Sequence, residues 1–358
     1  MKNVLISTGG TGGHVIPALN IHDHLKNNFK TFLVSDLRGS KYIDKNTYKA
    51  DIINIPRLGK NFIYWPKRVI NIIFSFIKSF IYLKKNNIDI LISTGGYMSI
   101  PLCFASIILK KKLYLFEPNS LLGSSNKFFL KYSNKIICYQ NILLNFPNKY
   151  NNKIVNINPI LKKNFYNLRK FLNSDFKDKL KILVIGGSQG ANFFDKTIFR
   201  ALKNMPKNVK IEVCQQISDK KNESFIKNEY KKNNIESTLF LYNEKIFETI
   251  NNYNLAIVRC GASTMAELTF LNLPFIGIPF PFAKDDHQYI NAQYYEKKNC
   301  CWILKQDNNT ADKLVILLNN ILQNRDTISE KKHNMAKISS QNNWSDVNKI
   351  LVNLLNEN

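Results

Sequence analysis

A strand that runs into a glycine-rich turn occurs three times in this chain of 358 residues. The three segments are residues 6–14 (ISTGGTGGH), 92–97 (ISTGGY) and 184–191 (VIGGSQGA). A glycine pair after a parallel strand lets the backbone turn tightly and point N–H groups at a ligand, and the helix that follows offers its positive end to an anion. The repetition therefore predicts anion-binding turns on a fold of parallel strands.

Short β-rich runs alternate with longer helical patterns along the whole chain, which is the rhythm of βα units and a parallel sheet. The expected strands are 4–7, 31–34, 51–55, 88–93, 113–116, 135–139 and 154–157, and, after a Lys/Asn-rich stretch, 182–185, 209–214, 239–242, 255–258 and 275–278. We expect an α/β protein with two Rossmann-like domains, residues 1–161 and 162–343, and a helix at about 344–358 that packs back on the first domain. Because ligands bind beyond the carboxyl ends of such strands, the two parallel sheets are expected to face a central cleft.

None of the glycine turns matches the G-x-G-x-x-G dinucleotide fingerprint, and none is followed by the Lys-Ser/Thr pair of a P-loop, which disfavours a dehydrogenase or an ATPase. His14 stands where the first turn enters its helix. A helix N-terminus disfavours a positive imidazole, so His14 is placed to act as a neutral general base. The alternative is that His14 only caps or packs against the helix start.

A second candidate segment is residues 259–268 (RCGASTMAEL), which follows an expected strand. Thr264 and Glu267 have the spacing of a capping box, which needs no ligand. The functional interpretation keeps the helix start for an anion and lets Glu267 accept hydrogen bonds from a sugar diol. Both interpretations stay open from the sequence.

Lys and Arg number 51 against 26 Asp and Glu, a formal net charge of +25. Such a surplus favours anionic partners such as nucleic acid, an anionic membrane or an anionic small molecule, although dispersed lysines are equally consistent with compositional drift. The six cysteines show no C-x-x-C spacing, so neither a zinc site nor a disulfide framework is expected, and a reducing compartment is. The N-terminal residues enter a strand before a signal-peptide apolar core could form.

Residues 69–83 form an apolar run of about fifteen residues, shorter than the roughly 20 needed to span a bilayer. One helical stripe is expected to pack on the sheet: Val69, Ile72, Ile73, Phe76 and Phe80. A second stripe, with basic residues before it, is expected to rest in an anionic membrane interface: Ile70, Phe74, Ile77 and Ile81, with Lys67 and Arg68. The alternative is a helix buried on all sides.

Four segments together carry a resemblance: residues 9–17 (GGTGGHVIP), 95–101 (GGYMSIP), 186–191 (GGSQGA) and the block 261–288. In order and spacing the chain resembles the membrane-associated N-acetylglucosaminyltransferases of peptidoglycan synthesis, which are family 28 glycosyltransferases of the GT-B fold. The resemblance implies inverting transfer of N-acetylglucosamine from UDP-N-acetylglucosamine to the muramoyl 4-hydroxyl of an undecaprenyl-diphosphate-linked pentapeptide. It also implies an acceptor-binding, membrane-associating first domain, a UDP-sugar-binding second domain, and a peripheral location at the cytoplasmic face of the inner membrane.

The resemblance implies His14 as the base, with no metal or other cofactor, because glycine-turn N–H groups and helix ends can stabilise the leaving UDP. It places the donor on Thr11, Gly12, Gly13, Asn119, Ser188, Asn243 through its backbone, Ala262, Ser263, Thr264, Met265, Ala266, Glu267 on the ribose, and Gln288. The chain departs from the family pattern beside Asn119, at Phe116 and Pro118, and at Leu161, which replaces an arginine that contacts the donor. Lys162 is a candidate substitute, but its ammonium group is a point charge and lacks the planar, bidentate hydrogen-bond donors of an arginine.

Two other functions compete with the transferase. A UDP-sugar 2-epimerase would share the two-domain architecture, but it needs acid and base groups around the second carbon of the sugar and no membrane face. A nucleic-acid-binding protein would use the positive charge, but no nucleic-acid motif is present and aromatic residues do not interleave with a basic stripe.

Overall fold

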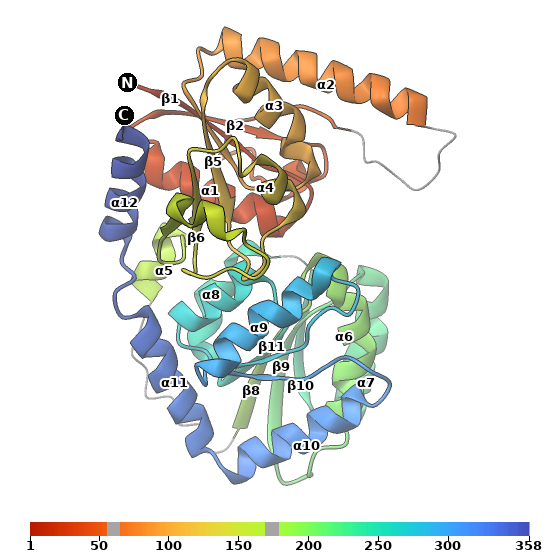
Figure 1. The fold of residues 1–358 in the computed structure, drawn as a ribbon. Coiled ribbons are helices and arrows are strands. Elements are labelled where there is room, and N and C mark those ends of the chain that lie inside the picture. The colour runs from red at the N-terminus through yellow and green to blue at the C-terminus, as the bar shows by residue number, and fades with distance from the viewer. Residues whose placement is uncertain (56–64, 169–178, 242, 358) are drawn as a thin grey trace. The chain divides into compact units, whose positions relative to one another are not determined.

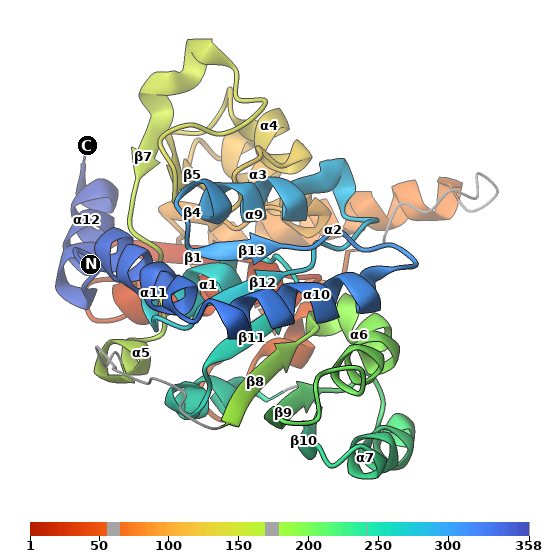
Figure 2. The ribbon, with the colours of Figure 1, turned by 90° about the horizontal axis from the view of Figure 1, so that it is seen from below.

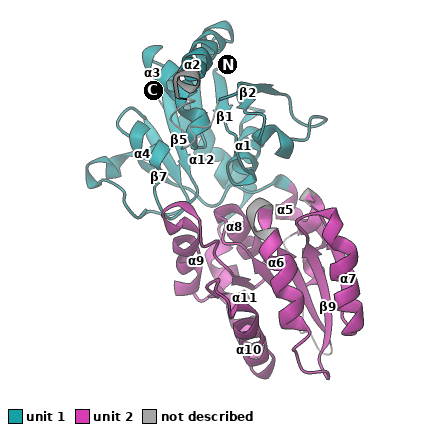
Figure 3. Ribbon diagram, turned by 90° about the vertical axis from the view of Figure 1, so that its right-hand side faces the viewer, with its two compact units in different colours: residues 1–163, 342–358 teal, residues 164–341 magenta. Residues whose placement is uncertain are grey.

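The computed structural model describes residues 1–55, 65–168, 179–241 and 243–357. The chain divides into two compact units: unit 1 holds residues 1–163 and 342–358, and unit 2 holds residues 164–341 (Figure 3). Both crossing points lie within two residues of the boundaries expected from the sequence. The acceptor and donor roles assigned to the two domains stay predictions, as does the cleft.

Unit 1 is built on a seven-stranded sheet in the order β3-β2-β1-β4-β5-β6-β7, with every neighbouring pair parallel. The strands are β1 (Asn3–Ser7), β2 (Lys30–Ser35), β3 (Ala50–Ile52), β4 (Ile90–Ser93), β5 (Lys112–Glu117), β6 (Lys135–Cys138) and β7 (Ile154–Asn156). The strand order reverses direction between β1 and β4, and ligands of open α/β sheets bind at such a switch point. Two of the three glycine turns follow these two strands.

Helices cover both faces of this sheet because side chains alternate between the faces along each strand. Val4 and Ile6 join one core with α1 (Gly12–Leu25) and α12 (Trp344–Asn356). Leu5 joins the opposite core, which includes residues of α2 (Trp65–Lys85), α3 (Ile100–Ile108) and α4 (Ser124–Phe129). The short α5 (Lys163–Leu168) follows at the crossing between the units.

Helix α12 belongs to unit 1 although it ends the chain (Figure 1). Leu351 and Leu355 on this helix lie in the same core as α1. Backbone carbonyls near its end accept hydrogen bonds from unit 1, at 2.8 Å from Lys2 Nζ to Leu355 and 3.1 Å from the Tyr114 hydroxyl to Leu354. The terminal helix therefore packs on the first unit.

Unit 2 repeats the arrangement with a six-stranded parallel sheet in the order β10-β9-β8-β11-β12-β13; Figure 2 shows β11, β8, β9 and β10 side by side. The strands are β8 (Lys179–Ile185), β9 (Lys210–Gln216), β10 (Glu236–Phe240), β11 (Leu255–Val258), β12 (Phe275–Gly277) and β13 (Cys301–Ile303). The helices are α6 (Gly187–Leu202), α7 (Glu223–Lys232), α8 (Ala262–Phe270), α9 (His287–Lys297), α10 (Thr310–Gln323) and α11 (Asp326–Ser339). The third glycine turn lies between β8 and α6.

Two strands of unit 2 differ from the expectation. Strand β10 ends at Phe240, so it overlaps the expected run 239–242 only at its last two residues, and Tyr242 lies outside the described residues. The edge strand β13 was not predicted at all, because its three residues are too few to show an alternation.

The stripe expected to pack α2 on the sheet is partly wrong. Ile73 was assigned to it but is 52% exposed, whereas Ser75 and Ser79 are buried at 3% and 0%. Both hydroxyls donate to the carbonyl four residues earlier, at 2.7 Å, so α2 can bury them without leaving either hydroxyl unpaired. No helix within the described ranges has the length and apolarity to cross a bilayer.

Candidate active site

The first glycine turn connects β1 to α1 at the carboxyl edge of the unit 1 sheet. Gly10 has a left-handed backbone, with φ of 79°, which a glycine adopts without strain. Helix α1 begins at Gly12 after the extended N-cap Thr11, whose side chain makes no capping bond. The N–H groups of Gly12 and Gly13 thus lie in the first helical turn, where the helix itself supplies no acceptor.

His14 lies in this first turn and connects it to the second glycine turn. Its Nδ1 lies 2.8 Å from the carbonyl oxygen of Thr94, directly before Gly95. A carbonyl only accepts, so we assign the proton to Nδ1, and the neutral ring keeps a lone pair on Nε2. A Cβ built on Gly96 would lie 3.6 Å from that Nε2, so this turn lies directly against the imidazole. The N-cap is Thr11, so the interpretation of His14 as a cap is wrong.

Asn119 follows β5 and is held by Glu117. The Glu117 carboxylate is 3% exposed and its Oε1 accepts from Asn119 Nδ2 at 2.8 Å and from Asn119 N at 3.3 Å. Its Oε2 accepts from Gly123 N and Asn126 Nδ2, both at 2.9 Å. Leu161, where the family pattern has arginine, is buried at 2% in unit 1. The departure at this position therefore leaves an apolar core residue.

In unit 2, the turn between β8 and α6 places Gly187 in a left-handed conformation with φ of 63°. The Gly187 N–H donates to Gln216 Oε1 at 3.0 Å, so the end of β9 holds this turn. Ser188 lies in the first turn of α6, and its side chain is outside the described part of the chain. Its candidate role stays a prediction.

The segment 262–267 forms the start of α8, and the capping-box interpretation is wrong. The helix begins at Ala262 after the N-cap Gly261, which makes Thr264 its third residue. Within the described residues, the Ser263 hydroxyl is buried without a hydrogen-bond partner. Glu267, buried at 6%, follows one helical turn later. Met265 and Ala266 face the interior, whereas Ala262, Ser263 and Thr264 are half-buried.

Gln288, at the start of α9, uses its side-chain oxygen within unit 2. Its Oε1 accepts from Cys260 N at 3.2 Å and from Phe280 N at 2.9 Å, so it joins the segments that follow β11 and β12. Asn243 is the N-cap of the short helix Glu244–Asn252, and its Oδ1 accepts from Lys245 N at 2.9 Å. Its side chain is occupied locally, which agrees with a role through the backbone.

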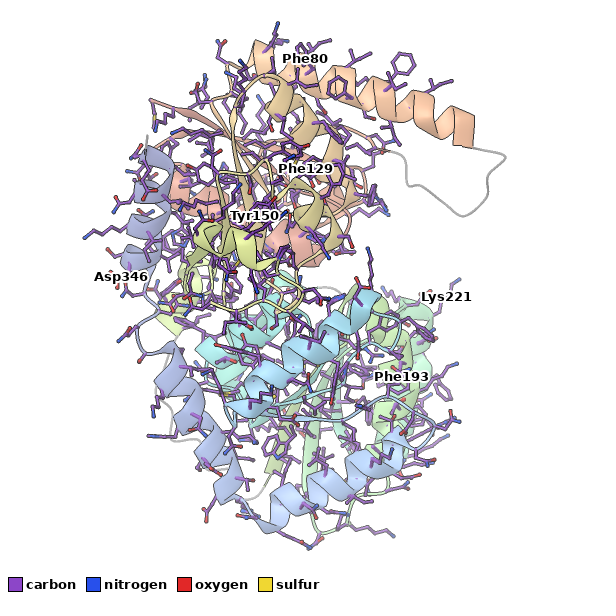
Figure 4. All side chains as sticks on the ribbon, viewed as in Figure 1. Phe80, Phe129, Tyr150, Phe193, Lys221 and Asp346 are labelled. Atoms are coloured by element: carbon purple, nitrogen blue, oxygen red, sulfur yellow. The ribbon has the colours of Figure 1, made fainter. Side chains whose placement is uncertain are left out.

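Arg259 was not singled out from the sequence. It is buried at 6%, forms no salt bridge to a described residue, and donates to the carbonyls of Ile278 and Pro279 at 3.0 Å each. Its guanidinium carbon lies 5.1 Å and 4.9 Å from the ring centres of Phe193, labelled in Figure 4, and Phe194 on α6. Burial lowers the pKa of Arg259 to about 10. An arginine directly after a buried strand and two residues before a glycine is the signal that could have found it.

The candidate residues thus gather into two groups, one in each unit. In unit 1 the candidates are Thr11, Gly12, Gly13 and His14 at the start of α1, after β1, and Asn119 after β5, which is separated from β1 by β4 in the same sheet. The turn of Ser188, the start of α8 and Gln288 follow β8, β11 and β12, which are neighbours in the second sheet. Within the described ranges, no group of three or more His, Cys, Asp or Glu could hold a metal ion, and all six cysteines are buried thiols.

Two solved structures that share this architecture indicate the fold class of the protein. A crystal structure of MurG from Acinetobacter baumannii matches with a TM-score of 0.75 at 22% identity, covering 99% of both chains. A UDP-GlcNAc 2-epimerase from Neisseria meningitidis bound to UDP-GlcNAc matches with a TM-score of 0.65 at 12% identity, covering 99% of this chain and 100% of the other. These likenesses show the fold, and the fold is that of the GT-B glycosyltransferases.

The family follows from sequence. Residues 4–138 match the glycosyltransferase family 28 N-terminal domain, and residues 181–347 match the glycosyltransferase family 28 C-terminal domain. A relative from Pelagibacter ubique is 44% identical over 100% of this chain and 99% of its own length, and one from Rickettsia canadensis is 33% identical with the same coverage. Both are named UDP-N-acetylglucosamine–N-acetylmuramyl-(pentapeptide) pyrophosphoryl-undecaprenol N-acetylglucosamine transferase. The chain belongs to glycosyltransferase family 28.

Proposed function

We propose that this enzyme transfers N-acetylglucosamine, with inversion, from UDP-N-acetylglucosamine to the 4-hydroxyl of the muramoyl sugar of an undecaprenyl-diphosphate-linked pentapeptide. The names of its full-length relatives support this reaction. A UDP-sugar 2-epimerase is the alternative function that shares this fold, but a likeness at 12% identity supports architecture only. The membership in a glycosyltransferase family favours transfer over epimerisation.

The observation that carries the proposal is the hydrogen bond of His14. Because Nδ1 donates to Thr94, Nε2 is the ring nitrogen able to accept a proton. In the proposed reaction Nε2 removes the proton of the acceptor hydroxyl as that oxygen attacks the anomeric carbon. General-base help of this kind contributes about 10²–10⁴-fold to a rate.

The donor is assigned to residues of both units. Glu267 would accept from the ribose hydroxyls, the unpartnered Ser263 hydroxyl and the start of α8 would meet the donor, and the turn of Ser188 would take the diphosphate. The sugar end of the donor would be bound by Thr11, Gly12, Gly13 and Asn119. Gln288 and the backbone of Asn243 would complete the donor site. Helix starts and backbone N–H groups can stabilise the UDP leaving group without a metal.

The enzyme is further proposed to bind peripherally to the cytoplasmic face of an anionic inner membrane through α2. The predicted interface residues Ile70, Phe74, Ile77 and Ile81 are 52%, 59%, 45% and 56% exposed, so a helix buried on all sides is excluded. The side chains of Lys67 and Arg68 lie outside the described part, and their role stays a prediction. A monomer rarely exposes this much apolar surface on one helix without a partner.

Further exposed apolar side chains lie on α3, which packs against α2, and on α4; Figure 1 shows where the three helices lie in unit 1. Phe104 and Ile108 on α3 are 38% and 59% exposed, and Phe128 on α4 is 58% exposed. The Phe104 and Phe128 rings lie 5.7 Å apart, so the two helices share one aromatic corner. Exposed lysines stand on these helices or directly after them: Lys78, Lys84, Lys85, Lys110, Lys127 and Lys131. Near an anionic membrane each could add about 1 kcal/mol.

The reaction is tested with labelled UDP-N-acetylglucosamine and a short-chain lipid-linked muramoyl acceptor. We expect label in the lipid-linked product only when both substrates are present. Conversion of UDP-N-acetylglucosamine alone to the 2-epimer would instead establish the epimerase.

Membrane association is tested by sedimentation with liposomes of anionic or neutral lipid. We expect the variant Phe74→Ser/Ile81→Ser to associate less with anionic liposomes than the unmodified enzyme. The matched control is Phe225→Ser/Ile316→Ser, which removes two exposed apolar side chains, 58% and 60% exposed, from unit 2. Equal partitioning of the α2 variant and the control would contradict the membrane surface.

A further inference from the structure

Asp36 stands directly after β2, at the end of the strand that neighbours β1. In dinucleotide-binding folds an acidic residue near this position binds the ribose of the nucleotide. Here the carboxylate is 1% exposed. All the hydrogen bonds described for it come from the chain itself, so its chemistry in this protein is different.

Both carboxylate oxygens are surrounded by donors. Oδ1 accepts from Gly10 N at 2.8 Å and from Gly39 N at 2.7 Å. Oδ2 accepts from Arg38 Nη2 at 2.6 Å, from Arg38 Nε at 3.1 Å and from the Tyr97 hydroxyl at 3.2 Å. Although burial opposes ionisation, these donors hold the pKa of Asp36 below its usual value. Asp36 is therefore a buried carboxylate anion that is surrounded by N–H and O–H donors.

These bonds join three loops. Gly10 belongs to the first glycine turn, and Tyr97 directly follows Gly96 in the second. The loop that carries Gly39 folds closely over the first turn, because a Cβ on Gly39 would lie 2.6 Å from the Gly9 Cα and 2.4 Å from Ser35 Oγ. The Arg38 guanidinium also stacks on the Tyr97 ring, with its carbon 4.7 Å from the ring centre.

The joined turns are the two that flank His14. The first turn carries His14 four residues after Gly10, and the second presents Gly96 against Nε2 and accepts the Nδ1 proton at Thr94. We infer that Asp36 is a positioning residue for the proposed reaction, which holds both glycine turns in register around the imidazole. Because both carboxylate oxygens already accept hydrogen bonds from the chain, Asp36 is not available to the hydroxyls of a ribose. A nucleotide is therefore not bound at this position of unit 1.

The inference rests on the proposed function and is tested by steady-state kinetics of Asp36→Asn with the lipid-linked acceptor. The asparagine amide must place its NH₂ group opposite one set of donors whichever way it turns. The hydrogen bonds on that side are therefore lost with almost no change in side-chain volume. We expect kcat to fall about 10- to 100-fold, as for small displacements of catalytic groups. The affinity for UDP, which lacks the sugar, should stay within about twofold, since the nucleotide is assigned to unit 2.

The matched control is Asp44→Asn, an exposed aspartate that accepts from Asn46 N and Thr47 Oγ1 near the same loop and touches neither glycine turn. It should keep the kcat of the unmodified enzyme. Tyr97→Phe removes a single hydrogen bond and should lower kcat about three- to tenfold, so it decides the matter if Asp36→Asn does not fold. If the unmodified enzyme is active and Asp36→Asn has the same kcat, the inference is overturned. If only Tyr97→Phe folds, an unchanged kcat in that variant overturns it. Failure of the unmodified enzyme to make product would instead overturn the proposed function.

Discussion

The packing of His24 predicts that unit 1 loses stability in mild acid. His24 lies on α1 with 0% exposure, and its ring stacks on Trp344 of α12 with centroids 3.6 Å apart and planes 16° from parallel. Neither ring nitrogen has a hydrogen-bond partner in the described residues. Protonation would place an unsatisfied cation between the two helices. Burial lowers the pKa of His24 to about 4, and the neighbouring Asp23 opposes that effect only in part.

The direction of the pH effect on stability follows from the pKa of His24 in the unfolded and folded states. The unfolded imidazole has its ordinary pKa of 6.5, above the value of about 4 in the folded protein, so the unfolded chain takes up the proton first as pH falls. The stabilisation is therefore complete above pH 6.5 and is lost on acidification. At pH 5, 1.5 pH units below the ordinary pKa, a cost of about 1.4 kcal/mol per unit gives a loss of about 2 kcal/mol.

Urea unfolding at pH 7 and pH 5, followed by tryptophan fluorescence, measures this loss. His24→Phe keeps an aromatic ring against Trp344 and removes the titrating group, so it should lose about 2 kcal/mol less between the two pH values. Hydrogen bonds from Lys26 Nζ at 2.8 Å and from the Tyr48 hydroxyl at 2.6 Å help to hold the pKa of Asp23 below its usual value despite burial, so that carboxylate changes stability only below the tested range. An equal loss in the variant and the unmodified enzyme would refute the reasoning.

Three further substitutions test the site. His14→Ala should lower turnover about 10²-fold or more while titration calorimetry finds UDP-N-acetylglucosamine binding little changed; unchanged turnover would remove His14 from the base role. Glu267→Ala should weaken UDP-N-acetylglucosamine binding about tenfold by the same calorimetry, and a variant that loses only thermal stability would contradict the ribose contact. Arg259→Met leaves the Ile278 and Pro279 carbonyls without their donor, so the thermal midpoint should fall by about 2–9 °C; an unchanged midpoint in a calorimetric scan would show that these bonds contribute nothing.

The sequence predicted the parallel sheets and the positions of the glycine turns because both depend on local patterns. A strand followed by two glycines is visible within about ten residues, and the same pattern locates His14. The start of α8 was harder, because the spacing of Thr264 and Glu267 cannot tell which of several small residues becomes the N-cap. Gly261 takes that place, and Thr264 enters the helix.

Features that depend on distant partners were missed. Asp36 is one acidic residue in an ordinary loop until Gly10, Gly39 and Tyr97 are brought to it by the fold. The buried serines of α2 were assigned no place in the packing, because hydropathy does not register a hydroxyl that is already bonded to its own helix. In each case the missing information was a hydrogen-bond partner and not a residue type.

The two units hold the corresponding glycine turn with side chains of different charge. In unit 1 the turn after β1 is held by a carboxylate, because Gly10 N donates to Asp36 Oδ1 at 2.8 Å. In unit 2 the turn after β8 is held by a neutral amide, because Gly187 N donates to Gln216 Oε1 at 3.0 Å. Asp36 follows β2 and Gln216 ends β9, which are the equivalent neighbours of β1 and β8. A buried carboxylate beside a diphosphate would repel it, whereas an amide fixes the turn and leaves the positive end of α6 uncompensated. The choice of side chain at one strand end therefore agrees with a donor diphosphate in unit 2 and a proton-accepting imidazole in unit 1.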